Sequence, residues 1–158
     1  MLNISLLYKG YRLVPLSDRD YGVFKSYREK VSLETDNYFT ADVSSEVFSY
    51  IYLETTKPGN YGFLIVKGGN VVGEVFIRGA TAGNASFISS LVLVKSEQGK
   101  GVGTGLLKVV ESLCKSNGSV RCELVTDRKN KGLFSFYCGN GYKPSFIDED
   151  SVSFVKVL

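Results

Sequence analysis

Near its middle the chain reads Gln98-Gly99-Lys100-Gly101-Val102-Gly103-Thr104-Gly105. A predicted strand over residues 85–94 enters this segment, and a predicted amphipathic helix leaves it. Closely spaced glycines let a backbone approach a ligand without obstruction by Cβ atoms. The free N–H groups at the start of a helix, together with the positive end of its dipole, form a site for phosphate. The segment therefore predicts a phosphate-binding loop, to which Lys100 adds positive charge.

Two well-known phosphate loops do not fit this segment. The Walker pattern G-x-x-x-x-G-K-[ST] is absent from it. The dinucleotide pattern G-x-G-x-x-G cannot be placed on its glycines either, because Thr104 and Leu106 interrupt the spacing. Taken alone, the segment also fits a flexible surface turn before a helix.

Outward from this loop, strands and helices alternate. Strands are expected at residues 11–16, 61–66, 71–77, 85–94, 120–126 and 152–157. Helices are expected after Ser17 or Asp18, after a loop over residues 33–42 with a cap near Asp42 or Ser44, after the glycine loop, and around Leu133. Antiparallel hairpins come first and a strand–helix–strand unit follows, with no repeat or linker between them. The sequence therefore predicts one α+β domain over residues 1–158.

Composition narrows the class of protein. The chain has 158 residues, of which 44% are hydrophobic and 22% charged, and its net charge is +3; these values are ordinary for a soluble globular protein and argue for neither nucleic acid nor a membrane as partner. No apolar run approaches the ~18 residues that span a bilayer, and residues 1–10 do not resemble a signal peptide. Three widely spaced cysteines and no histidine favour a reduced, cytoplasmic protein without a metal site. The missing histidine also removes the commonest general base.

Two further motifs accompany the glycine loop. The loop itself matches [QR]-x-x-G-x-[GA] as Gln98-x-x-Gly101-x-Gly103. After one more strand come Asn130, Leu133, Phe136 and Tyr137, similar to N-x-x-A-x-x-[FL]-Y, and then the pair Gly141-Tyr142. In this combination and order the chain resembles the GNAT superfamily of acetyl-CoA-dependent N-acyltransferases. The resemblance extends over essentially the whole chain, because residues 11–20 are similar to the family's first strand and helix entry.

The resemblance implies a fold and a cosubstrate. The fold is a mostly antiparallel, twisted sheet of six to seven strands, flanked by about four helices and splayed between the two strands around the CoA site. The cosubstrate is acetyl-CoA, with no metal. The implied CoA contacts are backbone groups of Leu93 and Val94 for the pantetheine arm, the loop of Gly99, Lys100, Gly101, Val102, Gly103 and Thr104 for the pyrophosphate, Gln98 shaping that loop, and Asn130 and Leu133 along the molecule.

The resemblance also implies the reaction: an acetyl or other acyl group passes from acetyl-CoA to a primary amine by direct attack in a ternary complex. Tyr137 would protonate the departing thiolate, for which a phenol of pKa ~10 is suitable; simple packing beside Phe134 and Phe136 is the alternative reading. Some members carry a carboxylate base on the strand before the loop, where this chain has Ser89 and Ser90.

The general base is therefore open. Glu74 is the catalytic candidate, while Glu123 and Asp127 are alternatives, each acting through a water, and solvent alone could take the proton. Cysteines 114 and 122 are expected in the core. Cys138 could approach the thioester, but no histidine is present to activate it.

Charge is distributed unevenly along the chain. Residues 95–143 carry nine Lys/Arg against four acids, and residues 29–54 carry six acids against one lysine. The basic half suits the CoA phosphates, and the acidic half suggests a cationic small molecule or a peptide or protein amine as the acceptor. A monomer or homodimer is expected. The rival functions are a catalytically silent acyl-CoA-binding regulatory module of the same fold and, less well supported, a nucleotide-binding α/β protein.

Overall fold

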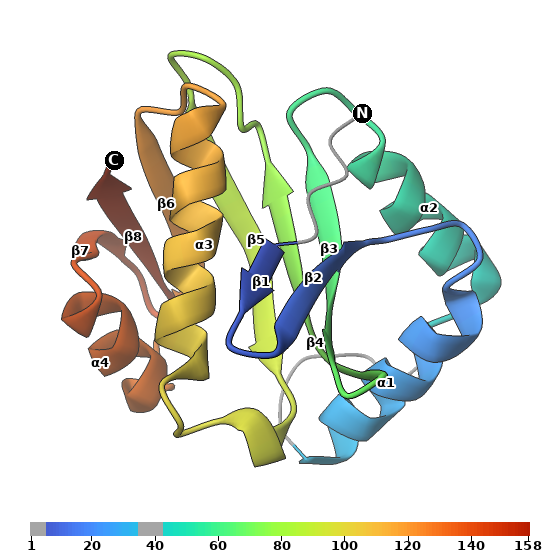
Figure 1. Ribbon diagram of the computed structural model, residues 1–158. Helices are drawn as coiled ribbons and strands as arrows, with labels where there is room; N and C mark the ends of the chain where they lie inside the picture. The colour runs from blue at the N-terminus through green and yellow to red at the C-terminus, as the bar shows by residue number, and fades with distance from the viewer. Residues whose placement is uncertain (1–5, 35–42) are drawn as a thin grey trace.

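Eight strands form one mixed sheet in the computed structural model, which describes residues 6–34 and 43–158 (Figure 1). The strands are β1 (Leu6–Tyr8), β2 (Tyr11–Pro15), β3 (Tyr61–Lys67), β4 (Asn70–Arg78), β5 (Ala85–Leu93), β6 (Arg121–Asp127), β7 (Lys143–Ile147) and β8 (Ser151–Val157). Their order across the sheet is β1-β2-β3-β4-β5-β6-β8-β7. All neighbouring strands are antiparallel except β5 and β6, which are parallel.

The helices cover both faces of this sheet. Within the described ranges they are α1 (Tyr21–Glu34), α2 (Ser45–Thr55), α3 (Val102–Ser116) and α4 (Lys131–Gly139), with a short 3-10 turn, η1 (Lys95–Glu97), before the glycine loop. Leu64 of β3 packs with Phe24 and Phe48 of α1 and α2, whereas its neighbour Ile65 belongs to the cluster that contains Leu106 of α3. Because consecutive strand residues point to opposite faces, α1 and α2 lie on one face and α3 on the other. None of these helices is both long and apolar enough to cross a membrane.

Strands β5 and β6 stay together for only a short distance. They pair at Ala85↔Arg121, Ser86↔Cys122 and Phe87↔Glu123. Beyond Phe87, no strand in the described part of the chain pairs with that edge of β5, while the other edge of β6 stays paired with β8 as far as Asp127. The two strands therefore diverge toward their carboxyl ends, and the glycine loop follows β5 at that open end.

The fold class and the splayed strand pair are confirmed, with local differences. The sheet has eight strands rather than six or seven, because two strands join the six expected ranges: Leu6–Tyr8, which forms an extra hairpin strand with β2, and Lys143–Ile147, which pairs with β8. Helix α1 begins after Asp20, not after Ser17 or Asp18, because Phe24 N–H donates to the Asp20 carbonyl and the Asp20 carboxylate accepts from Ser17 N–H at 2.7 Å. Ser44 caps α2 by accepting from Val47 N–H at 3.2 Å. Asp42 and most of the predicted loop over residues 33–42 lie outside the described residues.

The extra hairpin strand makes Gly105 sensitive to substitution. A Cβ at this position of α3 would lie 2.0 Å from Cζ of Tyr8 in β1. Gly105→Ala is expected to destabilise the protein by about 1–3 kcal/mol, because the ring and its hairpin must shift, although alanine favours helix by about 1 kcal/mol. Urea denaturation measures this cost. In a Tyr8→Ala background the same substitution should be neutral or stabilising, and an equal cost in both backgrounds would contradict the packing argument.

Candidate active site

The glycine loop has an open face at the start of α3. Gly99 and Gly101 have φ angles of 73° and 78°, a left-handed conformation that other residues adopt only at a cost. A Cβ on either residue would meet no heavy atom within 4 Å, so conformation, and not crowding inside the protein, requires glycine there. Gly101 is the N-cap of α3 and provides no side-chain cap. The N–H groups of the first helical turn are therefore left for an anion.

Side chains behind the loop hold its shape. Gln98 Nε2 donates to the Leu93 carbonyl at 2.9 Å, which closes the turn between β5 and α3. Glu97, which is buried, accepts a hydrogen bond from the Tyr11 hydroxyl and one from Lys67 Nζ at 3.3 Å. These bonds lower the pKa of the Glu97 carboxyl, the Tyr11 bond most. Lys100 is exposed on the loop, with its Nζ 4.0 Å from Glu97.

A cleft of about 530 Å³ occupies the space between the diverging strands. One wall is the open edge of β5 from Ile88 to Val92, and the other is β6 from Leu124 to Asp127 with the start of α4. Asn130 and Leu133 line it, and the Asn130 side chain caps α4 by accepting from Leu133 N–H at 3.0 Å. The glycine loop does not line the cleft, but it follows β5, the strand whose edge does.

The predicted contacts Leu93 and Val94 follow directly on the part of β5 that lines the cleft. Leu93 and Val94 do not line the cleft, and both are buried in the main core cluster. The Val94 N–H already donates to the Val72 carbonyl at 2.8 Å, and the Leu93 carbonyl accepts from Gln98. The edge that lines the cleft is instead Ile88 to Val92. The pairing of the pantetheine arm with Leu93 and Val94 stays a prediction.

Tyr137 lies at the inner end of the cleft. It is 5% exposed and packs against the rings of Phe136, Tyr142 and Phe154. Burial raises the pKa of Tyr137 to about 12, so its hydroxyl is protonated throughout the neutral range. Among the described residues the hydroxyl has no hydrogen-bond partner. Tyr137 therefore lines the cleft with its hydroxyl protonated.

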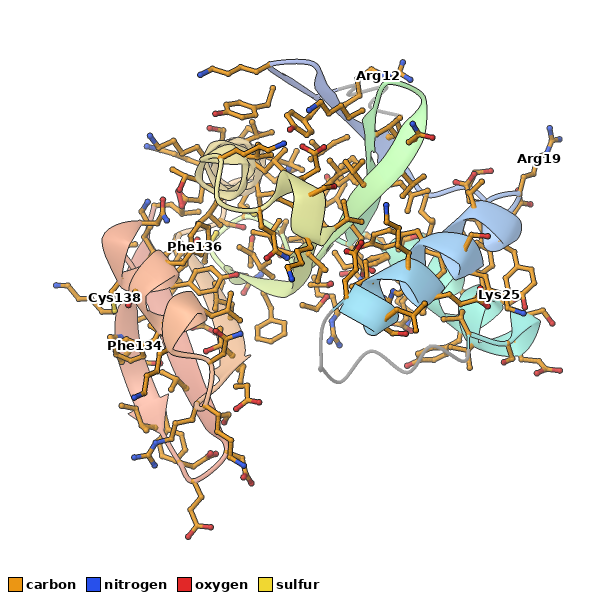
Figure 2. The ribbon with its side chains drawn as sticks, turned by 90° about the horizontal axis from the view of Figure 1, so that it is seen from below. Arg12, Arg19, Lys25, Phe134, Phe136 and Cys138 are labelled. Carbon is orange, nitrogen blue, oxygen red and sulfur yellow. The ribbon has the colours of Figure 1, made fainter. Side chains whose placement is uncertain are left out.

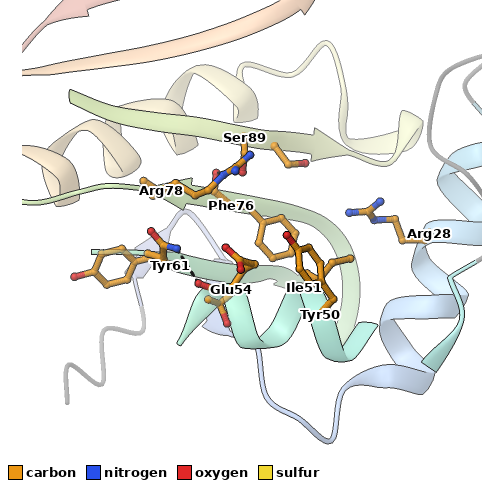
Figure 3. A pocket seen from close by; sticks show the side chains of 12 residues that line it. Arg28, Tyr50, Ile51, Glu54, Tyr61, Phe76, Arg78 and Ser89 are labelled. Carbon is orange, nitrogen blue, oxygen red and sulfur yellow. Dashed lines mark hydrogen bonds between the residues drawn. The ribbon is translucent and has the colours of Figure 1, made fainter. Parts of the chain in front are cut away.

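A second pocket, of about 310 Å³, lies between α2 and strands β3 to β5 (Figure 3). Tyr50, Tyr61 and Phe76 give it aromatic walls, and Arg28, Glu54 and Arg78 line it as charged groups. Ser89 and Ser90 line both this pocket and the cleft. They can do so because Phe76 pairs with Ser90 and Ile77 with Ile88, which leaves Ser89 as an extra residue in a bulge of β5. The two cavities therefore meet at this bulge.

Glu74 lies behind the bulge in a buried charge network. Its side chain is 0% exposed, and its carboxylate contacts Arg28 from Nε at 2.6 Å and from Nη2 at 2.8 Å. The Ser90 hydroxyl donates to Glu74 Oε2 at 3.0 Å. Burial raises the pKa of the Glu74 carboxyl, and Arg28 opposes that shift. Ser90 therefore stands between the pocket and a carboxylate of raised proton affinity.

Other predicted candidates lie apart from this junction. Glu123 lines neither cavity and pairs with Arg121 at 2.7 Å. Asp127 lines the outer cleft, where its carboxylate accepts from Lys129 N–H at 2.8 Å. Cys138 is exposed on α4 and does not line the cleft; it is labelled with Phe134 and Phe136 in Figure 2, on the opposite side of the molecule from Lys25 of α1. Cys114 and Cys122 are buried, as predicted.

Sequence reasoning missed two arginines of the pocket. Arg28 follows Phe24 by one helical turn. The sequence therefore indicated that Arg28 lies on the same face of α1 as the buried Phe24. Arg78 ends β4 and lies four residues after Glu74, so strand alternation pointed both side chains toward one face. Neither signal identifies a site without the β4–β5 pairing.

The sequence model of the acetyltransferase (GNAT) family matches residues 24–142. No curated protein matches the chain in sequence.

Among solved structures, the PaiA N-acetyltransferase from Thermoplasma acidophilum in complex with coenzyme A is 19% identical, with a TM-score of 0.77 over 94% of this chain and 99% of that one. RimL, a ribosomal L7/L12 α-N-protein acetyltransferase, is 14% identical, with a TM-score of 0.81 over 100% and 96%. The microcin C7 self-immunity acetyltransferase MccE, in complex with acetyl-CoA and AMP, is 15% identical, with a TM-score of 0.76 over 96% and 94%. These similarities support the fold. Because the family match covers most of the chain, the protein belongs to the GNAT acetyltransferase family.

Proposed function

We propose that this protein transfers an acetyl group from acetyl-CoA to a primary amine, with both substrates bound at once. The observation that carries the proposal is the meeting of the cleft and the second pocket at Ser89 and Ser90. One cavity runs along the open edge of β5, and the glycine loop follows the carboxyl end of the same strand. The other reaches the same point from the opposite side and provides room for a small amine or a peptide terminus. PaiA and RimL, which share the fold, are N-acetyltransferases by name.

In this proposal acetyl-CoA binds along the cleft in one direction. Its pyrophosphate would accept from the first-turn N–H groups of α3, at the loop from Gly99 to Thr104. Its pantetheine arm would then run along the open edge of β5 from Ile88 to Val92, adding a short strand to the sheet. Asn130 and Leu133 would face it from α4. This direction brings the thioester to Tyr137 and the bulge.

The chemistry follows from the groups at the junction. A neutral amine attacks the thioester carbonyl, a C–N bond forms, and the C–S bond breaks as the tetrahedral intermediate collapses. The ammonium proton passes to the Ser90 oxygen or a water, and the Ser90 hydroxyl passes its own proton to Glu74, whose raised pKa suits a base. Tyr137 gives its proton to the departing thiolate and regains one from solvent. The products are an N-acetyl amide and CoA with a free thiol.

Thermal unfolding with acetyl-CoA tests the first half of the proposal. At a concentration 100 times its Kd, acetyl-CoA should stabilise the protein by about 2.7 kcal/mol. The Gly101→Ala variant should bind it about tenfold more weakly, because alanine disfavours the left-handed loop conformation. Gly69→Ala is the matched control: Gly69 has the same φ of 78° and the same open space, but lies in the β3–β4 hairpin. It should lose stability and keep its acetyl-CoA affinity.

Release of the free CoA thiol in the presence of a panel of amines tests the second half. Absence of any shift with acetyl-CoA would refute the proposed function. A shift without thiol release from any amine would indicate a silent acyl-CoA-binding module instead.

A further inference from the structure

The charges of the second pocket do not cancel. Arg28 is matched by the buried Glu74. Glu54 is paired with Lys57, which does not line the pocket. Arg78 lines the pocket with an exposed side chain. Among residues 6–34 and 43–158 it has no ion pair or hydrogen bond. Its guanidinium lies over the Phe87 ring, 5.6 Å from the ring centroid. The described lining therefore has one unmatched positive charge.

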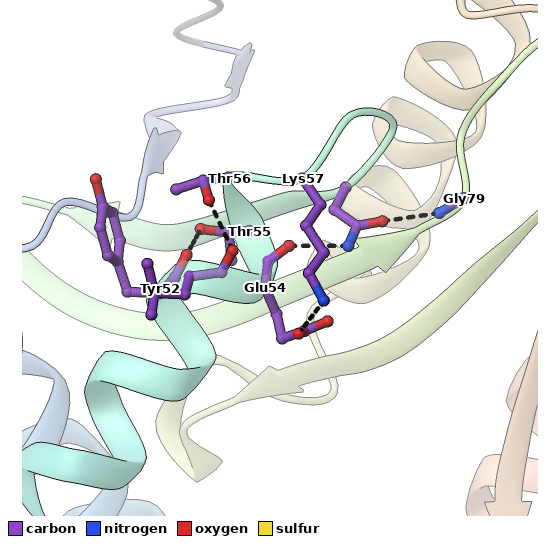
Figure 4. Close-up of polar contacts among 8 residues, drawn as sticks. Tyr52, Glu54, Thr55, Thr56, Lys57 and Gly79 are labelled. Atoms are coloured by element: carbon purple, nitrogen blue, oxygen red, sulfur yellow. Dashed lines mark hydrogen bonds and ion pairs between the residues drawn. The ribbon is translucent and has the colours of Figure 1, made fainter.

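The backbone next to Arg78 is tied to the end of α2 through Asn60. Asn60 Nδ2 donates to the Glu54 carbonyl at 2.8 Å, and Asn60 Oδ1 accepts from the N–H of Gly79, the residue after Arg78, at 3.1 Å (Figure 4). These two bonds tie the end of α2 to the end of β4. Arg78 and Arg28 consequently line the pocket from different ends, with the ring of Phe76 between them (Figure 3). A group bound at Arg78 would thus lie across the pocket from the Arg28–Glu74 pair.

We propose that the acceptor of this enzyme is a small amine that also carries an anionic group, a carboxylate or a phosphate, and that Arg78 binds this group. The inference rests on the proposed function and names its substrate class. A planar guanidinium without a protein carboxylate forms paired hydrogen bonds with either anion. With the anion at Arg78, the amine of a short molecule reaches Ser90 and the thioester. A pocket of about 310 Å³ has room for such a molecule.

Two matched pairs of amines test the inference: β-alanine with β-alaninamide, and O-phosphoethanolamine with ethanolamine. Each pair differs in the anionic group, so the pairs separate carboxylate from phosphate recognition. In the wild-type enzyme the anionic member of at least one pair should have the higher kcat/KM. Arg78→Gln should lower kcat/KM for that member about tenfold and change it less than about twofold for the neutral member. The quantity to compare between variants is the ratio of kcat/KM for the anionic member to kcat/KM for the neutral member, because the different amine pKa values affect this ratio equally in each variant.

Two further variants and a second readout sharpen the test. Arg78→Lys should keep part of the preference, and Arg19→Gln, the same charge change at an exposed residue outside the pocket, should keep all of it. Calorimetric titration of the four amines into the CoA-saturated protein needs no turnover and should show the same Arg78-dependent ratio. An unchanged ratio in Arg78→Gln for both pairs, or a preference for the neutral members, would overturn the inference while leaving acetyl transfer intact. Failure of the proposed function would appear separately, as a lack of acetyl-CoA binding or thiol release.

Discussion

Tyr137→Phe is expected to lower kcat about 100-fold, with little change in the KM for acetyl-CoA. The substitution removes one hydroxyl and keeps the ring, which packs with Phe136, Tyr142 and Phe154. General-acid catalysis typically contributes about 10²–10⁴-fold, and the thiolate of CoA would otherwise leave without a proton donor. Because the pKa of Tyr137 is raised to about 12, a loss of wild-type activity between pH 8 and about pH 10 would not come from its ionisation.

A neighbouring tyrosine provides the control. Tyr142 is buried in the same aromatic cluster, does not line the cleft, and donates to Glu111 at 3.3 Å. Tyr142→Phe should lose some stability and keep the wild-type kcat. Steady-state thiol release and urea denaturation measure the two effects separately. Equal turnover by Tyr137→Phe and the wild-type would exclude Tyr137 as the acid and leave it as a packing residue.

Glu74→Gln is expected to impair both turnover and folding. The substitution leaves the Arg28 guanidinium, whose side chain is 14% exposed, without its carboxylate. Breaking such a buried pair costs about 3–5 kcal/mol. Loss of the base should lower kcat about 100-fold. Wild-type activity should also fall with decreasing pH at a pKa above the ordinary glutamate value, because Glu74 must be deprotonated to accept a proton and burial raises its pKa.

Ser90→Ala distinguishes catalysis from stability at this network. It removes the hydroxyl between the pocket and Glu74 while leaving the Arg28–Glu74 pair in place. The free energy of unfolding of the variant should lie within about 1 kcal/mol of the wild-type value, and its kcat should be about tenfold lower. A Glu74→Gln variant that is destabilised, yet keeps the wild-type kcat and the wild-type loss of activity at low pH, would assign Glu74 a structural role only.

The sequence predicted well what depends on neighbouring residues. The glycines of the loop, the cap at Ser44 and the apolar stripe of α3 are local patterns, and each lies where it was expected. Strand β1 was missed because three residues carry too short a pattern to stand out, and β7 was missed because all five of its residues are exposed and show no buried alternation.

The acceptor side depends on contacts between distant segments. Arg28 meets Glu74 across 46 residues, and Ser90 meets it across 16. The acids of the N-terminal half were counted as one field, yet Glu29 pairs with Lys25 and Glu54 pairs with Lys57. A sum over a segment could not reveal these local cancellations, nor the unmatched Arg78.

The divergence of β5 from β6 also bears on solubility. An unpaired strand edge is normally an aggregation hazard, because the edge of another sheet can add to it. The edge from Ile88 to Val92 lies inside the sheet order, with β6 and β8 beyond it. A flat, multistranded edge from a second molecule is too wide to enter such a recess, whereas a single slender chain is not. The fold can therefore keep an incomplete sheet, available to the cosubstrate under the proposed function, without offering that edge to other proteins.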